Sequence, residues 1–277
     1  MKFIQYLSHT HTPQTVDSYL RSVNHFLSHC KNKENSSYSD ILEYFTSKDK
    51  TSPRELAAIK KYFDYLIEIS KRTDHPCKNL TIKREAKPIQ FQDLFTSEEL
   101  EKLMERKSRY KQLEKRNKVI ISLLIYQGLS PANLTNLRIQ DIDLDQGTVY
   151  IRATPKLSRR TLELKPSQLL LFYRFIHEDR NVQNTDSDKL FIGKLGEDFK
   201  VDTLNRMLRP LKKLYKDRNL NANTIRKSVI TNWINEKGIS IEDAQLLAGH
   251  KWLSTTEKYK RSNAKKNVEL INRFFPI

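Results

Sequence analysis

The sequence is poor in cysteine and glycine, and it has no long apolar run. With only six glycines and two cysteines, Cys30 and Cys77, it is neither collagen-like nor disulfide-rich, and it suits a reducing compartment. The most apolar run, residues 119–126, is eight residues long and contains a serine, so it is too short to span a bilayer. Residues 1–13 lack the apolar core of a signal peptide. We therefore expect a cytoplasmic globular protein that does not enter a membrane.

Motifs for nucleotide, nicotinamide and zinc chemistry are missing as well. The chain has no Walker loop, no G-x-G-x-x-G, no H-E-x-x-H and no pair of C-x-x-C motifs. Its seven histidines are scattered without metal-ligand spacing. We therefore expect neither a metal nor a cofactor.

Positive charge is what the sequence has in excess. Lys and Arg number 50 against 33 Asp and Glu, a net charge of +17. Residues 200–277 alone hold 17 basic and 7 acidic side chains, a net charge of +10. Since this block also carries helical apolar patterns, it favours a folded surface that binds a polyanion. The plainer interpretation is a solvated basic face that keeps the protein soluble.

Helical periodicity predicts a small all-helical domain over residues 1–85. Helices are expected over residues 13–27 and 40–45, and a capping box at residues 52–55 begins a third. The periodicity then fails in a charged, proline-containing stretch, and we place a linker at residues 86–95.

Residues 96–277 are predicted to form a second, mainly helical domain with a small antiparallel sheet. Residues 148–151 and 161–164 alternate as strands do, around the basic hairpin 155–160, and residues 139–144 are a candidate third strand. Residues 254–257 are expected to begin a short helix that carries Tyr259. Helix starts and stops are further predicted at these positions: Thr96, Gly128, Ser130, Asn223, Gly238 and Ser240.

Large apolar side chains near the C-terminus have two interpretations. Trp233 and Trp252 are expected to lie in the core. The apolar end over residues 268–275 either folds back onto its own domain or docks on a neighbouring subunit.

Four short motifs in the second region resemble the tyrosine recombinase (phage integrase) family. The two nearest the C-terminus are the most specific when taken together. The resemblance covers most of residues 93–277, whereas residues 1–85 are similar to the family's core-binding domain in helix pattern alone. The motifs are residues 126–129 (Tyr-Gln-Gly-Leu), 223–226 (Asn-Thr-Ile-Arg), 247–250 (Leu-Ala-Gly-His) and 254–259 (Ser-Thr-Thr-Glu-Lys-Tyr).

The resemblance assigns a role to each of four side chains. Tyr259 is the implied nucleophile, which attacks a DNA phosphodiester to give a 3′-phosphotyrosine and a free 5′-hydroxyl. Arg226 is implied to clamp the phosphate, and His250 to donate a hydrogen bond to it. Lys156, in the predicted hairpin, is implied to protonate the departing 5′-oxygen. These residue types suit phosphoryl transfer, because guanidinium and imidazole groups offset the negative charge that builds on the phosphate oxygens.

The sequence departs from the family pattern at three positions. Ser130 stands where an arginine is usual, Asn133 where an acidic residue is usual, and Asn223 where a histidine is usual. Ser130 and Asn223 retain hydrogen-bonding groups, but each can also be a simple helix N-cap. Another arginine can make up for the missing one, and Arg159 or Arg160 can replace Lys156 as the phosphate contact.

The resemblance implies a site-specific recombinase of double-stranded DNA that needs neither metal nor ATP. It implies a two-domain, C-shaped clamp that is monomeric when free, forms a tetramer on two synapsed DNA sites, and associates with the nucleoid. One alternative is a DNA-binding relative that has lost catalysis through Ser130 and Asn223. The other is a helical transcriptional regulator unrelated to recombinases. The sequence leaves open the target site, the direction of recombination, and a phage, transposon or chromosomal role.

Overall fold

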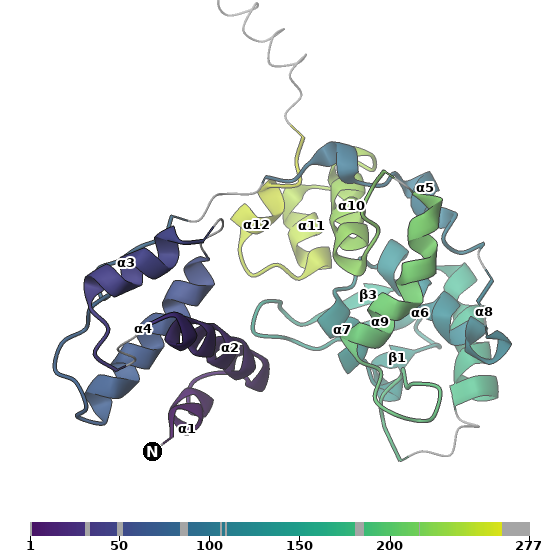
Figure 1. The fold of residues 1–277 in the computed structure, drawn as a ribbon. Coiled ribbons are helices and arrows are strands. Elements are labelled where there is room, and N and C mark those ends of the chain that lie inside the picture. Colours follow the sequence, from purple (N-terminus) through teal and green to yellow (C-terminus); the bar gives the residue numbers. More distant parts are fainter. Residues whose placement is uncertain are drawn as a thin grey trace, which may run out of the picture. The chain divides into compact units, whose positions relative to one another are not determined.

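The computed structural model describes residues 2–30, 34–48, 52–83, 88–105, 107–108, 110–180, 186–215 and 217–261. The chain divides into two compact units, Met1–Lys87 and Pro88–Ile277 (Figure 1). Within the described ranges, no helix combines the length and the apolar character needed to cross a bilayer.

The first unit is built from helices, as the sequence predicts. Helix α2 packs along α4, and α1, which the sequence analysis did not predict, contacts both. The apolar faces enclose a core that includes Phe26, Ile41, Ile59, Phe63 and Leu66. The helices are α1 (Phe3–Ser8), α2 (Pro13–His29), α3 (Tyr38–Thr46) and α4 (Pro53–Glu68).

The capping box predicted at the start of α4 is wrong. Ser52 precedes the helix, but its side chain makes no capping hydrogen bond. Glu55 is engaged elsewhere: it accepts a hydrogen bond from the Tyr44 hydroxyl and pairs with Lys48 Nζ, each at 2.6 Å. Contacts with Tyr44 on α3 and with Lys48, two residues beyond its end, therefore replace the capping interaction.

The second unit is mainly helical around one buried helix, α6. This helix packs against α5, α8 and α10, and all residues from Val119 to Ile125 along it are buried. The α-helices are α5 (Ser97–Glu101), α6 (Glu114–Tyr126), α7 (Pro131–Asn136), α8 (Pro166–Arg174), α9 (Val201–Leu208), α10 (Ala222–Asn235), α11 (Ile241–Ala248) and α12 (Leu253–Glu257). Shorter turns are η1 (Phe91–Asp93), η2 (Lys111–Leu113), η3 (Ile139–Asp141), the π-helix η4 (Phe175–Arg180) and η5 (Arg209–Leu214).

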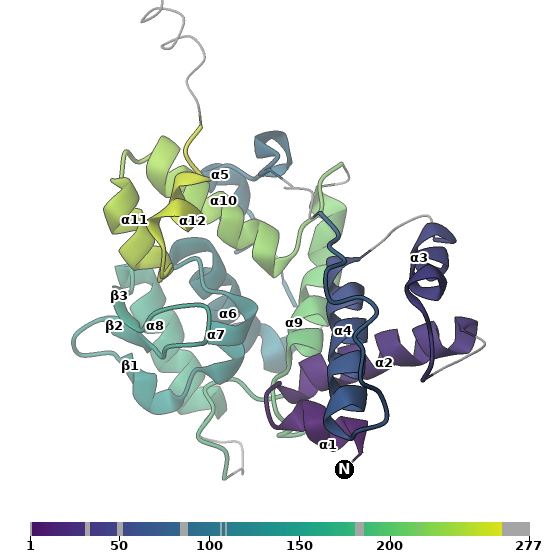
Figure 2. The ribbon, with the colours of Figure 1, turned by 90° about the vertical axis from the view of Figure 1, so that its left-hand side faces the viewer.

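The predicted sheet is present and antiparallel, in the order β1-β2-β3 (Figure 2). Its strands are β1 (Ile142–Asp143), β2 (Thr148–Ile151) and β3 (Arg160–Glu163). Val149 lies opposite Ile142 on one side and Leu162 on the other. Val149, Ile151 and Leu162 are buried, so burial alternates along β2 and β3 as the period-two pattern of the sequence indicates.

Most helix starts in this unit follow their local signals. Thr96, Ser130 and Ser240 each accept a hydrogen bond from a backbone N–H in the first turn, as predicted. Leu94 and Phe95, which the sequence analysis placed in the linker, are buried, and Phe95 belongs to the core of the second unit. The predicted apolar tail, residues 268–275, lies outside the described residues.

One of the two tryptophans contradicts its prediction. Trp233 is buried in the core, 6% exposed, as expected. Trp252 is 71% exposed, because it lies in the extended backbone before α12 and not on a helix face that meets the core.

Candidate active site

Arg226 is a buried cation held between two backbone turns. It lies on the inward face of α10, and its guanidinium donates through Nη1 to the Gly128 carbonyl and through Nη2 to the Ala248 carbonyl, both at 2.6 Å. Burial lowers the pKa of Arg226, and Tyr259 opposes that shift. The side chain thus joins the turn after α6 to the end of α11.

Gly128 makes the first of these turns possible. Its φ is +57°, and a Cβ there would lie 3.2 Å from Val229 and 3.3 Å from Trp233 on α10. Only glycine adopts this conformation at little cost and lets α10 approach so closely. The Tyr-Gln-Gly-Leu motif therefore presents a carbonyl to Arg226.

Gly249 ends α11 in the same left-handed conformation, with φ at +70°, and turns the chain toward His250. A Cβ at Gly249 would collide with the guanidinium of Arg160 on β3. The Leu-Ala-Gly-His motif is thus a helix end that leaves room for a second arginine and places an imidazole directly after it.

His250 is 8% exposed and lies against charged neighbours. Its Nδ1 is 2.9 Å from the hydroxyl of Thr256, which is fully buried. Burial, together with the nearby charges of Arg226 and Arg160, lowers the pKa of His250 to about 4. The imidazole is therefore neutral at pH 7. If Thr256 donates to Nδ1, the Nε2–H remains free to donate to a ligand.

Tyr259 lies in the turn just after α12, and not on the helix as predicted, because α12 ends at Glu257. Its ring stacks on the His250 ring, with centroids 5.9 Å apart and planes 20° apart. Burial raises the pKa of the Tyr259 phenol, while the Arg226 charge opposes that rise. The phenol is thus protonated at pH 7 and lies beside an imidazole and a cation.

The hairpin between β2 and β3 is joined to this cluster by its backbone. Leu157 pairs with His250 in an antiparallel bridge, and Ser158 N–H donates to the Gly249 carbonyl at 2.9 Å. Lys156 precedes this pairing in a tight turn and is exposed. The structure therefore brings the predicted lysine next to the histidine segment, on the open side of the site.

Arg160 is a second guanidinium in the cluster. Its Nε donates to the Leu247 carbonyl at 2.7 Å, next to the Ala248 carbonyl that Arg226 holds. Burial lowers the pKa of Arg160 to about 10, and the charge of Arg226 contributes to the shift. The end of α11, with its partial negative charge, thus lies against two arginines.

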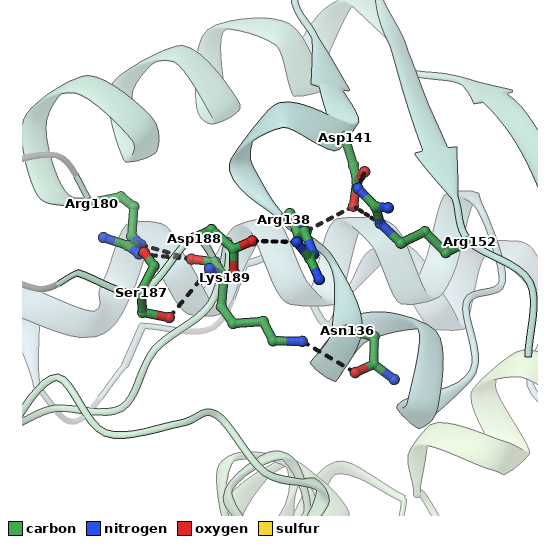
Figure 3. A network of polar contacts seen from close by, with 8 residues as sticks. All are labelled: Asn136, Arg138, Asp141, Arg152, Arg180, Ser187, Asp188 and Lys189. Carbon is green, nitrogen blue, oxygen red and sulfur yellow. Dashed lines mark hydrogen bonds and ion pairs between the residues drawn. The ribbon is translucent and has the colours of Figure 1, made fainter.

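No carboxylate balances these two arginines within the described part of the chain. Another arginine cluster in the same unit differs in this respect (Figure 3). There Arg138 pairs with Asp188 at 2.5 Å, and Arg152 pairs with Asp141 at 2.7 Å. Burying unpaired positive charge is unfavourable, so the Arg226 cluster is suited to an anion from outside the chain.

Two predicted site residues are not brought into the cluster by any hydrogen bond or ion pair among the described residues. Ser130 caps α7: its hydroxyl accepts from Asn133 N–H at 3.2 Å and donates to Asn133 Oδ1 at 2.8 Å. Asn223 is exposed on the first turn of α10 and is not the N-cap. Asn221 has that role, since its Oδ1 accepts from Thr224 N–H at 3.0 Å.

Two further residues support the site and were missed by the sequence analysis. Thr256 fixes the His250 ring, as described above. Asn235, at the end of α10, donates to the Tyr259 carbonyl at 2.8 Å and accepts from Arg261 N–H at 2.9 Å. The spacing of Thr256 and Tyr259, three residues apart in one motif, was a signal for Thr256. No signal in the sequence points to Asn235.

Residues 93–266 match the model of the phage integrase family, and this match spans more than half of the chain. The chain belongs to the phage integrase family. Among curated members, it is 26% identical over 273 residues to a tyrosine recombinase of Thermosipho africanus, with 93% of this chain and 92% of the relative covered. It is 25% identical to tyrosine recombinase XerC of Chlamydia trachomatis, covering 82% of this chain and 71% of XerC.

Solved phage integrase and recombinase structures share the fold. The XerH recombinase, in a post-cleavage complex with a palindromic difH substrate, superposes with a TM-score of 0.69 at 19% identity, covering 94% of this chain and 79% of XerH. A lambda integrase dimer bound to a core site gives a TM-score of 0.68 at 14% identity, covering 95% and 94%. The predicted fold class, mainly α with a small antiparallel sheet, is confirmed.

Proposed function

We propose that this protein is a site-specific recombinase that cuts and rejoins double-stranded DNA through a covalent bond between Tyr259 and a 3′-phosphate. The observation that carries the proposal is the convergence of the buried Arg226 and His250 with the half-buried Tyr259, in a cluster that has no carboxylate partner among the described residues. Such a cluster suits a phosphodiester, which brings one negative charge and oxygen acceptors.

Each group has a proposed task in the first step. Arg226 and the Nε2–H of His250 donate to the non-bridging oxygens, on which negative charge grows during attack. Tyr259 Oη forms a bond to phosphorus and gives up its proton to solvent, while the bond from phosphorus to the 5′-oxygen breaks. A protonated phenol in an apolar setting is a poor nucleophile. The positive charge of the cluster therefore has two effects: it attracts the phosphate to Tyr259, and it favours the ionised form of the phenol.

Lys156 completes the step from the hairpin. The 5′-oxygen leaves as an alkoxide unless it receives a proton, and an exposed ammonium on a turn joined to the His250 segment is placed to supply one. The new phosphodiester link to tyrosine conserves the energy of the broken one. A 5′-hydroxyl of another strand can therefore reverse the reaction without ATP, and the charge stabilisation comes from side chains instead of a metal.

Double-stranded DNA is the proposed partner. The last third of the chain carries a net charge of +10, and similar structures in the family include a XerH complex with difH and a lambda integrase complex with a core site. Exchange between two duplexes requires four cut strands, so we propose a tetramer on two sites that forms from free monomers. The proposed location is the cytoplasm, on the nucleoid, with a role in integrating or excising mobile DNA.

A suicide substrate tests the proposal. A binding site is first selected from a randomised duplex library, and a nick is then scanned along it, so that cleavage near the nick releases a short fragment and prevents rejoining. We expect an adduct that resists SDS with the native protein and none with Tyr259→Phe, which should bind the same DNA equally well. Adduct formation by Tyr259→Phe, or none by the native protein at any nick position, would refute the proposal.

A second candidate function is DNA binding without cleavage. It is favoured by one observation: Ser130, which replaces the usual arginine, uses its hydroxyl on Asn133. The same experiment separates the two, because a binding protein shifts the selected DNA and forms no adduct.

A further inference from the structure

Arg160 on β3 has donors to spare at the centre of the cluster. A guanidinium carries five N–H donors. Nε is used by the Leu247 carbonyl at 2.7 Å, and Nη1 lies at 3.4 Å from the Ser158 carbonyl, a weak contact. Nη2 is buried and finds no acceptor among the described residues. Burying a donor without an acceptor is unfavourable, so a ligand atom is expected to accept a hydrogen bond from Nη2.

The position of Arg160 is built into three separate elements. The Leu247 carbonyl at the end of α11 fixes its Nε. The missing side chain at Gly249 provides the space that the guanidinium fills. The hairpin that leads into β3 is held to the same segment by the Ser158–Gly249 hydrogen bond. These three features hold the Arg160 side chain in one position, whereas an exposed surface arginine requires none of them.

Arg160 also lies beside the two groups proposed to hold the phosphate. It and Arg226 donate to consecutive carbonyls, those of Leu247 and Ala248. Its charge acts on the His250 imidazole. Meanwhile Ser130, at the position where the family usually has its first arginine, is turned toward Asn133.

We propose that Arg160 supplies the second guanidinium of this active site, contacting a non-bridging oxygen of the scissile phosphate in place of the arginine that Ser130 replaces. The inference rests on the proposed cleavage of DNA by Tyr259. The transition-state charge is then stabilised by a residue on β3 that lies about 30 positions after Ser130 in the sequence.

The test compares rates of adduct formation on the suicide substrate. Arg160→Ala should lower the rate about 100-fold or more, the usual effect of removing one transition-state donor. DNA affinity, measured by mobility shift, should change by only a few fold. Lys165→Ala is the matched control, since it removes a positive charge beyond the other end of β3 and should keep the native rate.

A methylphosphonate at the scissile position separates contact with the phosphate from support of the fold. In a methylphosphonate, a neutral methyl group replaces one of the two non-bridging oxygens. Each diastereomer therefore needs less charge stabilisation at one of the two oxygen positions, and the position differs between them. One diastereomer should restore most of the rate of Arg160→Ala relative to native protein on the same DNA. If Arg160→Ala is slow and neither diastereomer reduces its deficit, Arg160 only supports the fold, and the inference is wrong.

Substitution at position 130 gives a second, independent test. If Arg160 already supplies the guanidinium, Ser130→Arg in the native background should not raise the rate. An increase would mean that the native site lacks this group, which overturns the inference. A native rate retained by Arg160→Ala would overturn it as well while leaving Tyr259 cleavage intact. Absence of an adduct from the native protein would instead refute the proposed function and this inference with it.

Discussion

Removing the imidazole of His250 should change how the stability of the second unit depends on pH. In the folded protein, burial and two arginines lower the pKa of His250 to about 4, against an ordinary value of about 6.5. Above pH 6.5 neither the folded nor the unfolded chain protonates this group. As the pH falls from 6.5 toward 4, only the unfolded chain takes up the proton, so stability decreases.

The size of the effect follows from the shift. Each pKa unit corresponds to about 1.4 kcal/mol, so His250 should cost the fold about 1.4 kcal/mol at pH 5.5 and about 3 kcal/mol in total below pH 4. The unfolding free energy of His250→Asn should lack this part of the pH dependence, although this variant should be less stable than the native protein at pH 7. The comparison is most informative between pH 5.5 and 7, where few carboxylates titrate.

Urea unfolding followed by tryptophan fluorescence measures this directly. The chain has two tryptophans, Trp233 and Trp252, and both lie in the unit that contains His250. His177→Asn, which removes an exposed imidazole of the same unit, serves as the control. Equal slopes of unfolding free energy against pH for native protein and His250→Asn would refute the reasoning about the buried neutral imidazole.

Two other predictions concern the proton donor to the leaving group and the contacts that position Tyr259. Lys156→Met should slow cleavage of an ordinary phosphodiester about 100-fold, but not cleavage of DNA with sulfur in place of the bridging 5′-oxygen, because a thiolate leaves without a proton. The same signature in Arg159→Met, and not in Lys156→Met, would move the acid to Arg159. Asn235→Ala removes two hydrogen bonds that hold the Tyr259 segment, worth about 1 kcal/mol each, and should lower the adduct rate about tenfold or more. Asn205→Ala, at an exposed site on α9, should not, and equal rates for the two variants would contradict the role of Asn235.

Features that depend on neighbouring residues could be predicted from the sequence. Thr96 and Ser130 are helix N-caps because their side chains bond to backbone groups three residues away. The strands of the hairpin follow from alternation, and Gly128 from the need for positive φ. These are contacts of short range, so the residue types in a window of a few positions determine them.

Features that depend on distant residues could not be predicted in this way. Glu55 was expected to bond within its own helix, but Lys48 and Tyr44 compete for it. Arg160 meets Leu247, 87 positions away, and Asn235 meets Tyr259, 24 positions away. No periodicity relates such pairs. The motifs thus singled out the tyrosine, arginine and histidine that lie together in the cluster, while their supporting contacts required the folded chain.

The unbalanced cationic cluster has a practical consequence for handling the protein. Sulfate and inorganic phosphate present the same tetrahedral oxygens as a DNA backbone, so we expect them to bind the cluster of Arg226 and His250 when no duplex is bound. Storage buffers rich in these ions should protect the molecule from heat and at the same time compete with its substrate. The conditions that best preserve the folded protein should therefore be those in which the proposed cleavage of DNA is slowest.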